Sequence, residues 1–106
     1  MPIRPAVLRA VAEQDITQAH DAYVAEGGMP LGLRFLQDIE AVLRRIETHP
    51  GIGSTRYWSL PDMKGARCVA PADFPFLVFY METEERLDVI RVLHQRRDIP
   101  ALLRDD

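Results

Sequence analysis

The sequence has a single cysteine, Cys68, so it can form no internal disulfide and no zinc site built from several thiolates. No apolar run approaches the roughly 20 residues that are needed to span a bilayer. Residues 1–9 lack the apolar stretch and the small-residue cleavage site of a signal peptide. We therefore expect a cytoplasmic protein with no membrane association, no metal ion and no cofactor.

A strong charge of either sign is also missing. The formal net charge is -3, so the molecule as a whole does not attract the phosphates of nucleic acid. A local basic site remains open, because Arg91, Arg96, Arg97 and Arg104 gather near the end of the chain. With 106 residues, 47% of them hydrophobic, the sequence predicts one domain over residues 1–106.

The first part of the sequence predicts a short edge strand and a helical hairpin. Residues 3–8 have alternating apolar side chains, but Pro5 has no N–H group to donate to a sheet and therefore belongs at an edge. Over residues 12–26, apolar and small residues recur every three or four positions, as on one face of a helix. The glycine pair 27–28 ends this helix, and Pro30 suits the first turn of the next one.

The second helix has the clearest amphipathic pattern. Its apolar face carries Phe35, Leu36, Ile39, Val42, Leu43 and Ile46. We expect Leu36 and Leu43 to be fully buried between the hairpin and the sheet. Pro50 and Gly51 stop the helix, and residues 52–62 are expected to form a loop.

The second half of the sequence predicts three antiparallel strands. Residues 76–81 and 87–93 are nearly unbroken apolar runs, rich in β-branched and aromatic residues, on either side of an acidic turn. Another strand, over residues 65–70, precedes them. The prediction is an α+β fold: an edge strand, a helical hairpin, a three-stranded antiparallel meander and a short C-terminal tail at residues 99–103.

Strands that are apolar at every position need cover on both faces, yet two helices can cover only one face of this sheet. The tail at residues 99–103 would cover part of the other face. We therefore expect an exposed apolar patch at Phe76, Val78 and Tyr80 or their neighbours. Such a patch is the usual mark of a site that binds a partner.

Residues 73–103 closely resemble the C-terminal half of ParE-type toxins of the RelE/ParE superfamily. The pattern is a Phe-Pro pair before an apolar strand that ends in Tyr80, then an acidic turn, a last strand and a tail. The matching residues of the last strand and tail are Val92, Leu93, His94, Arg97, Asp98, Ile99, Pro100 and Leu102. The glycine pair and the long second helix are similar to the same family. The sequence departs at Arg9 and Ala10, where the family commonly has a serine or threonine cap followed by proline.

The resemblance implies a two-layer RelE/ParE-like fold with the first strand at the edge beside the last. It also implies the toxin of a type II toxin–antitoxin system of the plasmid stabilisation kind, with an antitoxin that wraps it. ParE-like members poison DNA gyrase, whereas RelE-like members cut mRNA on the ribosome. The expected assembly is a homodimer or a toxin–antitoxin heterotetramer. A member that has lost toxicity and only binds its antitoxin is a further alternative.

RNA cleavage would require side chains that transfer protons and stabilise a phosphorane. The candidates for a nuclease site are Arg91, His94, Arg96 and Arg97, with Lys64 and Arg67 near the neighbouring strand. We favour the alternative that Arg97 and Asp98 form a structural ion pair and that His94 is a strand-end residue with a satisfied imidazole. RelE-like nucleases tend to have a C-terminal tyrosine and more lysines, whereas here Tyr80 is the last tyrosine and Lys64 the only lysine. The ParE-like reading, a gyrase poison rather than an enzyme, is therefore preferred.

Five other side chains are interpreted as structural. Tyr57 and Trp58 are expected to pack over the helices rather than stack on a base. His20 and His49 lack the carboxylate or thiolate spacing typical of a metal site, so we expect surface or capping roles for them. Cys68 is expected to be a small buried side chain and not a nucleophile.

Overall fold

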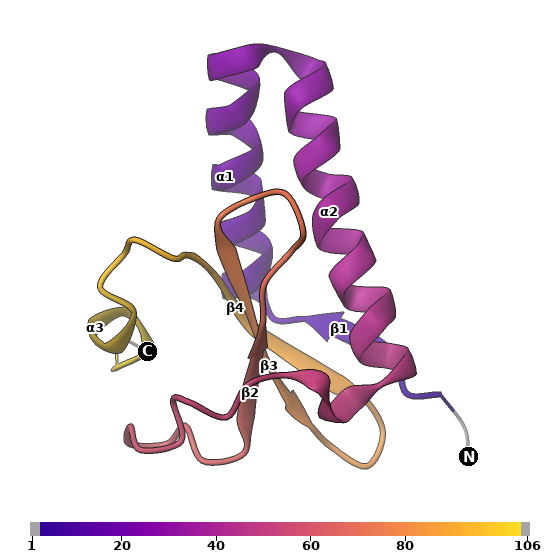
Figure 1. Cartoon of the computed structure of the whole chain (residues 1–106), viewed down its shortest axis with the longest axis vertical. Coiled ribbons are helices and arrows are strands. Elements are labelled where there is room, and N and C mark those ends of the chain that lie inside the picture. The colour runs from indigo at the N-terminus through magenta and orange to yellow at the C-terminus, as the bar shows by residue number, and fades with distance from the viewer. Residues whose placement is uncertain (1–2, 105–106) are drawn as a thin grey trace.

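A helical hairpin packed on one face of a mixed four-stranded sheet forms most of the molecule (Figure 1). This computed structural model describes residues 3–104. The elements are β1 (Ala6–Leu8), α1 (Ala10–Gly27), α2 (Met29–Thr48), η1 (Pro50–Ile52), β2 (Ala66–Val69), β3 (Phe76–Glu82), β4 (Leu87–His94) and α3 (Ile99–Arg104). The predicted α+β class and element order are confirmed, with the predicted tail forming α3. Within the described residues, no helix has both the length and the apolar content needed to cross a membrane.

The strand order β1-β4-β3-β2 places the first strand at the edge beside the last, as expected. β1 runs parallel to β4, whereas the β4–β3 and β3–β2 pairs are antiparallel. Pro5 precedes β1, and its carbonyl oxygen accepts the N–H group of Leu87 at 2.9 Å. Because Pro5 takes part only as an acceptor, its missing N–H group costs the sheet no hydrogen bond.

Two glycines shape the hairpin of α1 and α2. Gly28 connects the helices with a φ of 86°, a backbone conformation that other residues rarely adopt. Gly32 permits close helix packing, because a Cβ atom there would lie 2.5 Å from the Cγ2 atom of Val24. Pro30 occupies the first turn of α2, where a missing N–H group is tolerated. At the other end of the hairpin, the N-cap residue Arg9 makes no side-chain cap to α1.

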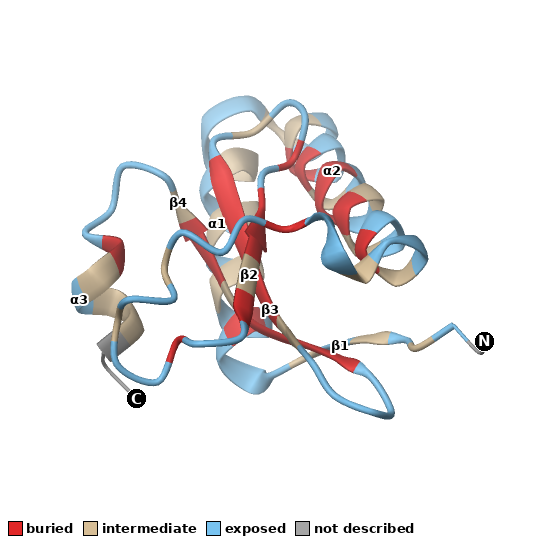
Figure 2. Ribbon diagram, turned by 60° about the horizontal axis from the view of Figure 1, so that its bottom comes forward, coloured by how far each residue is buried: buried red, intermediate tan, exposed pale blue. Residues whose placement is uncertain are grey.

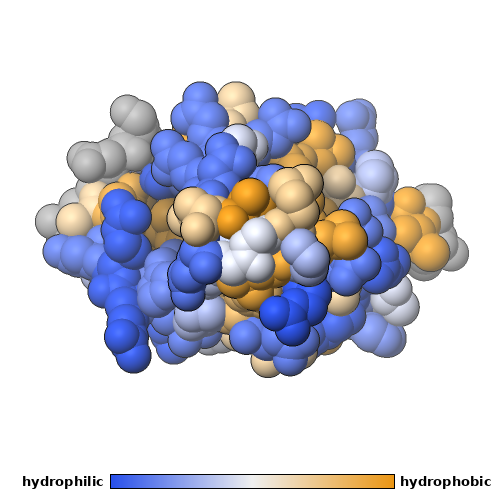
Figure 3. All heavy atoms as spheres, turned by 90° about the horizontal axis from the view of Figure 1, so that it is seen from above, coloured by the Kyte–Doolittle hydropathy of each residue, from blue (hydrophilic) through white to orange (hydrophobic). Residues whose placement is uncertain are grey.

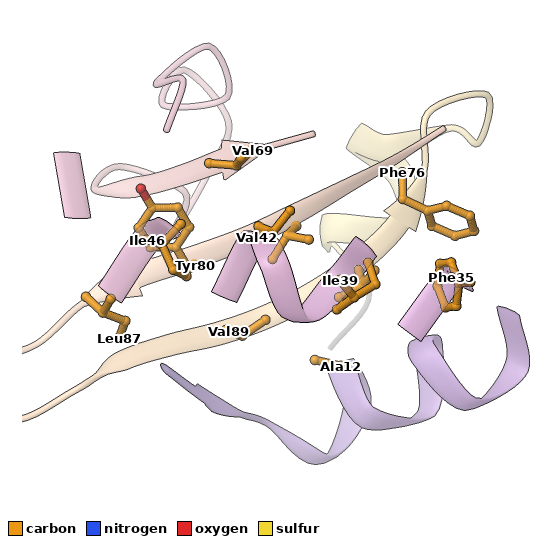
Figure 4. Packing of buried hydrophobic residues seen from close by; sticks show 12 residues of the cluster. Ala12, Phe35, Ile39, Val42, Ile46, Val69, Phe76, Tyr80, Leu87 and Val89 are labelled. Atoms are coloured by element: carbon orange, nitrogen blue, oxygen red, sulfur yellow. The ribbon is translucent and has the colours of Figure 1, made fainter. Parts of the chain in front are cut away.

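The main core lies between the hairpin and the sheet (Figure 4). The buried row of apolar α2 side chains that faces the strands consists of Phe35, Ile39, Val42 and Ile46. Leu36 and Leu43 lie at the margins of this row and are only half-buried. The expectation that these two leucines are fully buried is therefore wrong, because the face of α2 that meets the sheet is centred on the other four residues.

The opposite face of the sheet is covered by the protein's own loop and tail (Figure 2). The sheet side chains on this face pack against Tyr57, Leu60, Met63, Ile99, Leu102 and Leu103. This second cluster explains why the strands are apolar at every position. The expectation of an exposed patch at Phe76, Val78 and Tyr80 is therefore wrong, since all three side chains are buried beneath the hairpin.

A β-bulge explains how β4 contributes to both clusters. The pairing of β3 with β4 skips Ile90, so β4 holds one extra residue at this point. The spacing of side chains on each face therefore increases locally from two residues to three. Val89 and Val92 both face the hairpin, while Ile90 and Leu93 both face the loop.

Candidate partner-binding site

A groove opens on the loop-covered face of the sheet, between the start of α1, residues 61–63 and α3. Its volume is about 580 Å³. The large apolar side chains that line it are Val11, Met63, Met81, Ile90, Leu102 and Leu103. Three segments that are far apart in the sequence thus form one hollow.

The groove combines an apolar interior with a charged rim. Val11 is 47% exposed, although it is a large apolar side chain. Arg9 and Asp62 add opposite charges to the lining, and an ion pair with Asp88 at 3.2 Å holds Arg9. An apolar centre inside a polar rim is typical of protein–protein interfaces. The groove therefore suits the apolar side chains of a partner polypeptide.

Arg91 also lines the groove, but its guanidinium group is held in a mostly buried ion pair. Its Nε and Nη2 atoms donate to the two carboxylate oxygens of Asp15 at 2.8 and 3.0 Å. Its Nη1 atom donates to the carbonyl oxygen of Leu102 at 3.2 Å, and Asp15 also accepts the N–H group of Val92. These bonds join α1, β4 and α3, which is a structural role.

His94 faces the other side of the sheet. It pairs with Phe76 of the hairpin-side cluster, whereas Arg91 pairs with Phe79 of the loop-side cluster. The imidazole packs edge-on against Phe76 at a centroid distance of 5.2 Å, and its Nδ1 atom accepts the N–H group of Arg96 at 3.0 Å. His94 is thus a satisfied strand-end residue, as expected, and the sheet separates it from Arg91.

The other basic candidates lie in turns and at the far edge of the sheet. Arg96 and Arg97 are exposed in the turn after β4. Among the described residues, Arg97 forms no ion pair with Asp98, so that expectation is wrong. The Asp98 carboxylate instead caps α3, since it accepts the N–H group of Ala101 at 3.4 Å.

Arg67 and Lys64 lie at the β2 edge of the sheet. The Nη1 atom of Arg67 donates to the carbonyl oxygens of Gly51 and Gly53 at 3.3 and 3.0 Å. Lys64 is exposed in the loop before β2. The six basic candidates are therefore distributed over both faces and one edge of the sheet rather than gathered around one point.

Tyr57 packs on the sheet face opposite the hairpin and Trp58 lies against β2, so the expectation that they cover the helices is wrong. The ring centroid of Tyr57 lies 5.3 Å from that of Phe79. The indole N–H group of Trp58 donates to the carbonyl oxygen of Ala66 at 2.5 Å. Tyr57 thus fixes the loop to the loop-side cluster, and Trp58 fixes it to β2.

Tyr80, at the centre of the predicted patch, has a structural role. Its hydroxyl group donates to the carbonyl oxygen of Pro50 at 2.6 Å and accepts the N–H group of Gly53 at 3.1 Å. Burial raises the pKa of Tyr80 above its usual value, so the hydroxyl stays protonated. The side chain therefore ties β3 to the end of the helical hairpin.

His49 and Cys68 behave as expected, whereas His20 is half-buried beside Gly32 of α2. His49 is the C-cap residue of α2, and its N–H group donates to the carbonyl oxygen of Arg45. The Nδ1 atom of His20 lies 3.1 Å from a carboxylate oxygen of its neighbour Asp21. Cys68 is buried, and this burial raises the pKa of its thiol. Within residues 3–104, no group of His, Cys, Asp and Glu side chains is arranged to hold a metal ion.

One residue of α1 signals the groove in the sequence. Val11 is apolar but lies outside the periodic face of α1, whose inward residues include Ala12, Ile16 and Tyr23. An apolar residue out of phase with its helix points to a second contact. Met81 gave no such signal, because it continues the apolar run of its strand.

Comparisons with known proteins agree with this fold. The family model described as the ParE toxin of a type II toxin–antitoxin system, parDE, matches residues 7–99. A solved structure from the chromosomal ParDE toxin–antitoxin system of P. aeruginosa is similar, with a TM-score of 0.72 and 20% sequence identity. The match covers 87% of this chain and 96% of that chain. No curated protein matches the sequence.

Proposed function

The chain belongs to the ParE toxin family of type II toxin–antitoxin systems, and we propose that it acts in the cytoplasm as a toxin that inhibits DNA gyrase by binding. The arrangement of the basic side chains on β4 supports a mechanism without catalysis. Arg91 is paired with Asp15, and His94 lies on the opposite side of the sheet. Acid–base cleavage of RNA needs such groups within hydrogen-bond reach of the same phosphate.

Two assays test this proposal. Expression of the chain without its antitoxin should arrest growth, and the purified protein should inhibit gyrase in supercoiling or DNA-cleavage assays. Ribosome-dependent mRNA cleavage with gyrase unaffected would contradict the proposal and support a RelE-like nuclease. Antitoxin binding without growth arrest would identify a non-toxic member.

We also propose that the cognate antitoxin neutralises the toxin by filling the groove beside α1. The support is the 580 Å³ hollow and the exposure of Val11 at its edge. Other exposed apolar side chains, such as Met29 and Leu33, lie outside this groove. At the end of the hairpin where α1 and α2 are joined, exposed apolar groups lie among hydrophilic ones (Figure 3). Scattered apolar side chains are ordinary on a protein surface, whereas several around one hollow indicate a binding site.

A matched pair of variants tests the groove. Val11→Glu and Leu33→Glu each place a carboxylate at an exposed helical position, so both should fold. Val11→Glu should weaken antitoxin binding by roughly 100-fold, because a charge would be desolvated against apolar groups. Leu33→Glu should bind like the parent chain in isothermal titration calorimetry. Equal affinities for both variants would rule out the groove.

A further inference from the structure

The loop at residues 54–60 has a fixed shape at the β2 edge. Ser54 exchanges two backbone hydrogen bonds with Cys68, at 2.8 and 3.0 Å. The Oγ atom of Ser54 accepts the N–H group of Arg56, and the N–H group of Trp58 donates to the carbonyl oxygen of Thr55. A surface held in this way loses little conformational entropy when it binds a partner.

Cationic and aromatic side chains lie together on this loop and on β2 beside it. Arg56 donates to the hydroxyl of Tyr57 at 2.8 Å, and its guanidinium carbon lies 4.9 Å from the centroid of that ring. The guanidinium carbon of Arg67 lies 5.8 Å from the centroid of the Trp58 ring. Trp58 is 38% exposed. Arginine, tyrosine and tryptophan are the residues that most often dominate binding energy in protein interfaces.

The cations of this loop and of the neighbouring β2 edge lack acidic partners. Within residues 3–104, no carboxylate lies within ion-pair distance of Arg56, Lys64 or Arg67. In the same part of the chain, Arg34, Arg45, Arg96 and Arg97 also lack such a partner, so what distinguishes Arg56 and Arg67 is the aromatic ring beside each of them. We call Arg56, Tyr57, Trp58, Lys64 and Arg67 the cationic edge. No ion pair within residues 3–104 therefore neutralises the cations of this edge.

We propose that the cationic edge binds an acidic segment of the same antitoxin whose apolar residues fill the groove. This inference rests on the proposed function. Residues 61–63, which line the groove, directly follow the loop that carries Trp58, so one polypeptide can continue from the first surface to the second. Carboxylates of that segment complement the three cations, and an apolar residue among them covers the indole ring.

A protein segment fits this surface better than a nucleic acid does. Duplex DNA carries one negative charge per ~1.7 Å of its axis, so its phosphates would extend beyond three cations. Beyond the edge they would meet a protein surface with excess negative charge. A short acidic segment, in contrast, is small enough to lie entirely on the edge.

The only tryptophan of the chain provides the readout. Antitoxin added to the toxin should shift the fluorescence emission of Trp58. The same titration of the Trp58→Phe variant measures the fluorescence of the antitoxin itself, which is subtracted. Arg56→Glu and Lys64→Glu change exposed side chains and should each weaken binding by about tenfold, with a smaller dependence of affinity on salt. Arg34→Glu, an equal charge change on exposed α2, is the control and should bind like the parent chain.

The outcomes separate this inference from the proposed function. If Val11→Glu abolishes binding while Arg56→Glu and Lys64→Glu match Arg34→Glu, the groove is correct and the cationic edge is wrong. If none of the variants changes the affinity, both proposals fail. A third outcome is that a DNA duplex shifts the emission of Trp58, that Arg56→Glu abolishes this shift, and that the antitoxin causes none. This outcome would assign the edge to nucleic acid and overturn the inference.

Discussion

The carboxylate of Asp15 near the start of α1 accepts two N–H groups of Arg91 in β4, 76 residues later in the sequence. The pair is mostly shielded from water, with 12% and 19% of the two side chains exposed. Arg91 also reaches the carbonyl oxygen of Leu102 in α3. This one contact thus holds together the hairpin, the sheet and the C-terminal helix that frames the groove.

We expect Asp15→Asn to lower the free energy of unfolding by about 3 kcal/mol, because it leaves the mostly buried guanidinium of Arg91 without its counter-charge. Glu13→Gln changes an exposed acid two residues away and should cost less than about 1 kcal/mol. Urea denaturation of both variants measures the difference. Similar losses for both would show that the ion pair does not stabilise the fold.

The burial pattern of α2 predicts unequal costs for two truncations. Ile39→Ala should cost roughly 2 to 5 kcal/mol, because it leaves a cavity in the main core. Leu36→Ala should cost clearly less, since Leu36 is half-buried and water can fill the vacated space. Denaturant midpoints in the reverse order would mean that the other side of α2 faces the sheet.

His94→Gln tests whether toxicity needs acid–base chemistry. Glutamine can still accept the N–H group of Arg96 but cannot titrate near neutral pH. We expect growth arrest to be retained, because loss of a proton-transfer group costs ~10²- to 10⁴-fold in rate only where such a transfer occurs. A thermal melt must show that the variant is folded. A stable His94→Gln protein without toxicity would support the nuclease reading.

The hydroxyl group of Tyr80 should contribute measurably to stability. Tyr80→Phe leaves the buried N–H group of Gly53 without its acceptor and removes the donor to Pro50, at a cost of about 1 to 3 kcal/mol. The aromatic ring remains, so packing is preserved. Chemical denaturation measures the loss, and an unchanged unfolding free energy would mean that water replaces both bonds.

Asp88 should make stability depend on pH in the acidic range. The hydrogen bond from Arg86, reinforced by Arg9, holds the pKa of Asp88 below its ordinary value of 3.8. The pKa is therefore lower in the folded state than in the unfolded state. This contribution is complete above about pH 4 and is lost as the pH falls through the folded pKa.

Comparison with Asp88→Asn isolates this effect. The difference in unfolding free energy between the parent chain and Asp88→Asn should shrink as the pH is lowered from 6 to about 2. Urea titrations at a series of pH values provide the measurement. A difference that stays constant with pH would show that Asp88 does not contribute through its charge.

Local sequence features were sufficient to predict most of the architecture. The apolar spacing of α2, the glycine at position 28 and Pro30 specify a helical hairpin from nearby residues alone. Pro5 requires an edge position because of its own chemistry. The unbroken runs of β3 and β4 correctly indicated that both faces of the sheet are covered. Each of these features depends on residues close together in the chain.

The identity of what covers the second face was decided only by the tertiary structure. The sequence suggested a partner over Phe76, Val78 and Tyr80, but the helical hairpin buries these side chains. The loop and α3 cover the opposite face, and the bulge at Ile90 sets which β4 side chains face them. The groove beside Val11 exists because three distant segments meet there. Sequence periodicity reports how deeply an element is buried; it does not report which distant segment buries it, because that depends on packing of the whole chain.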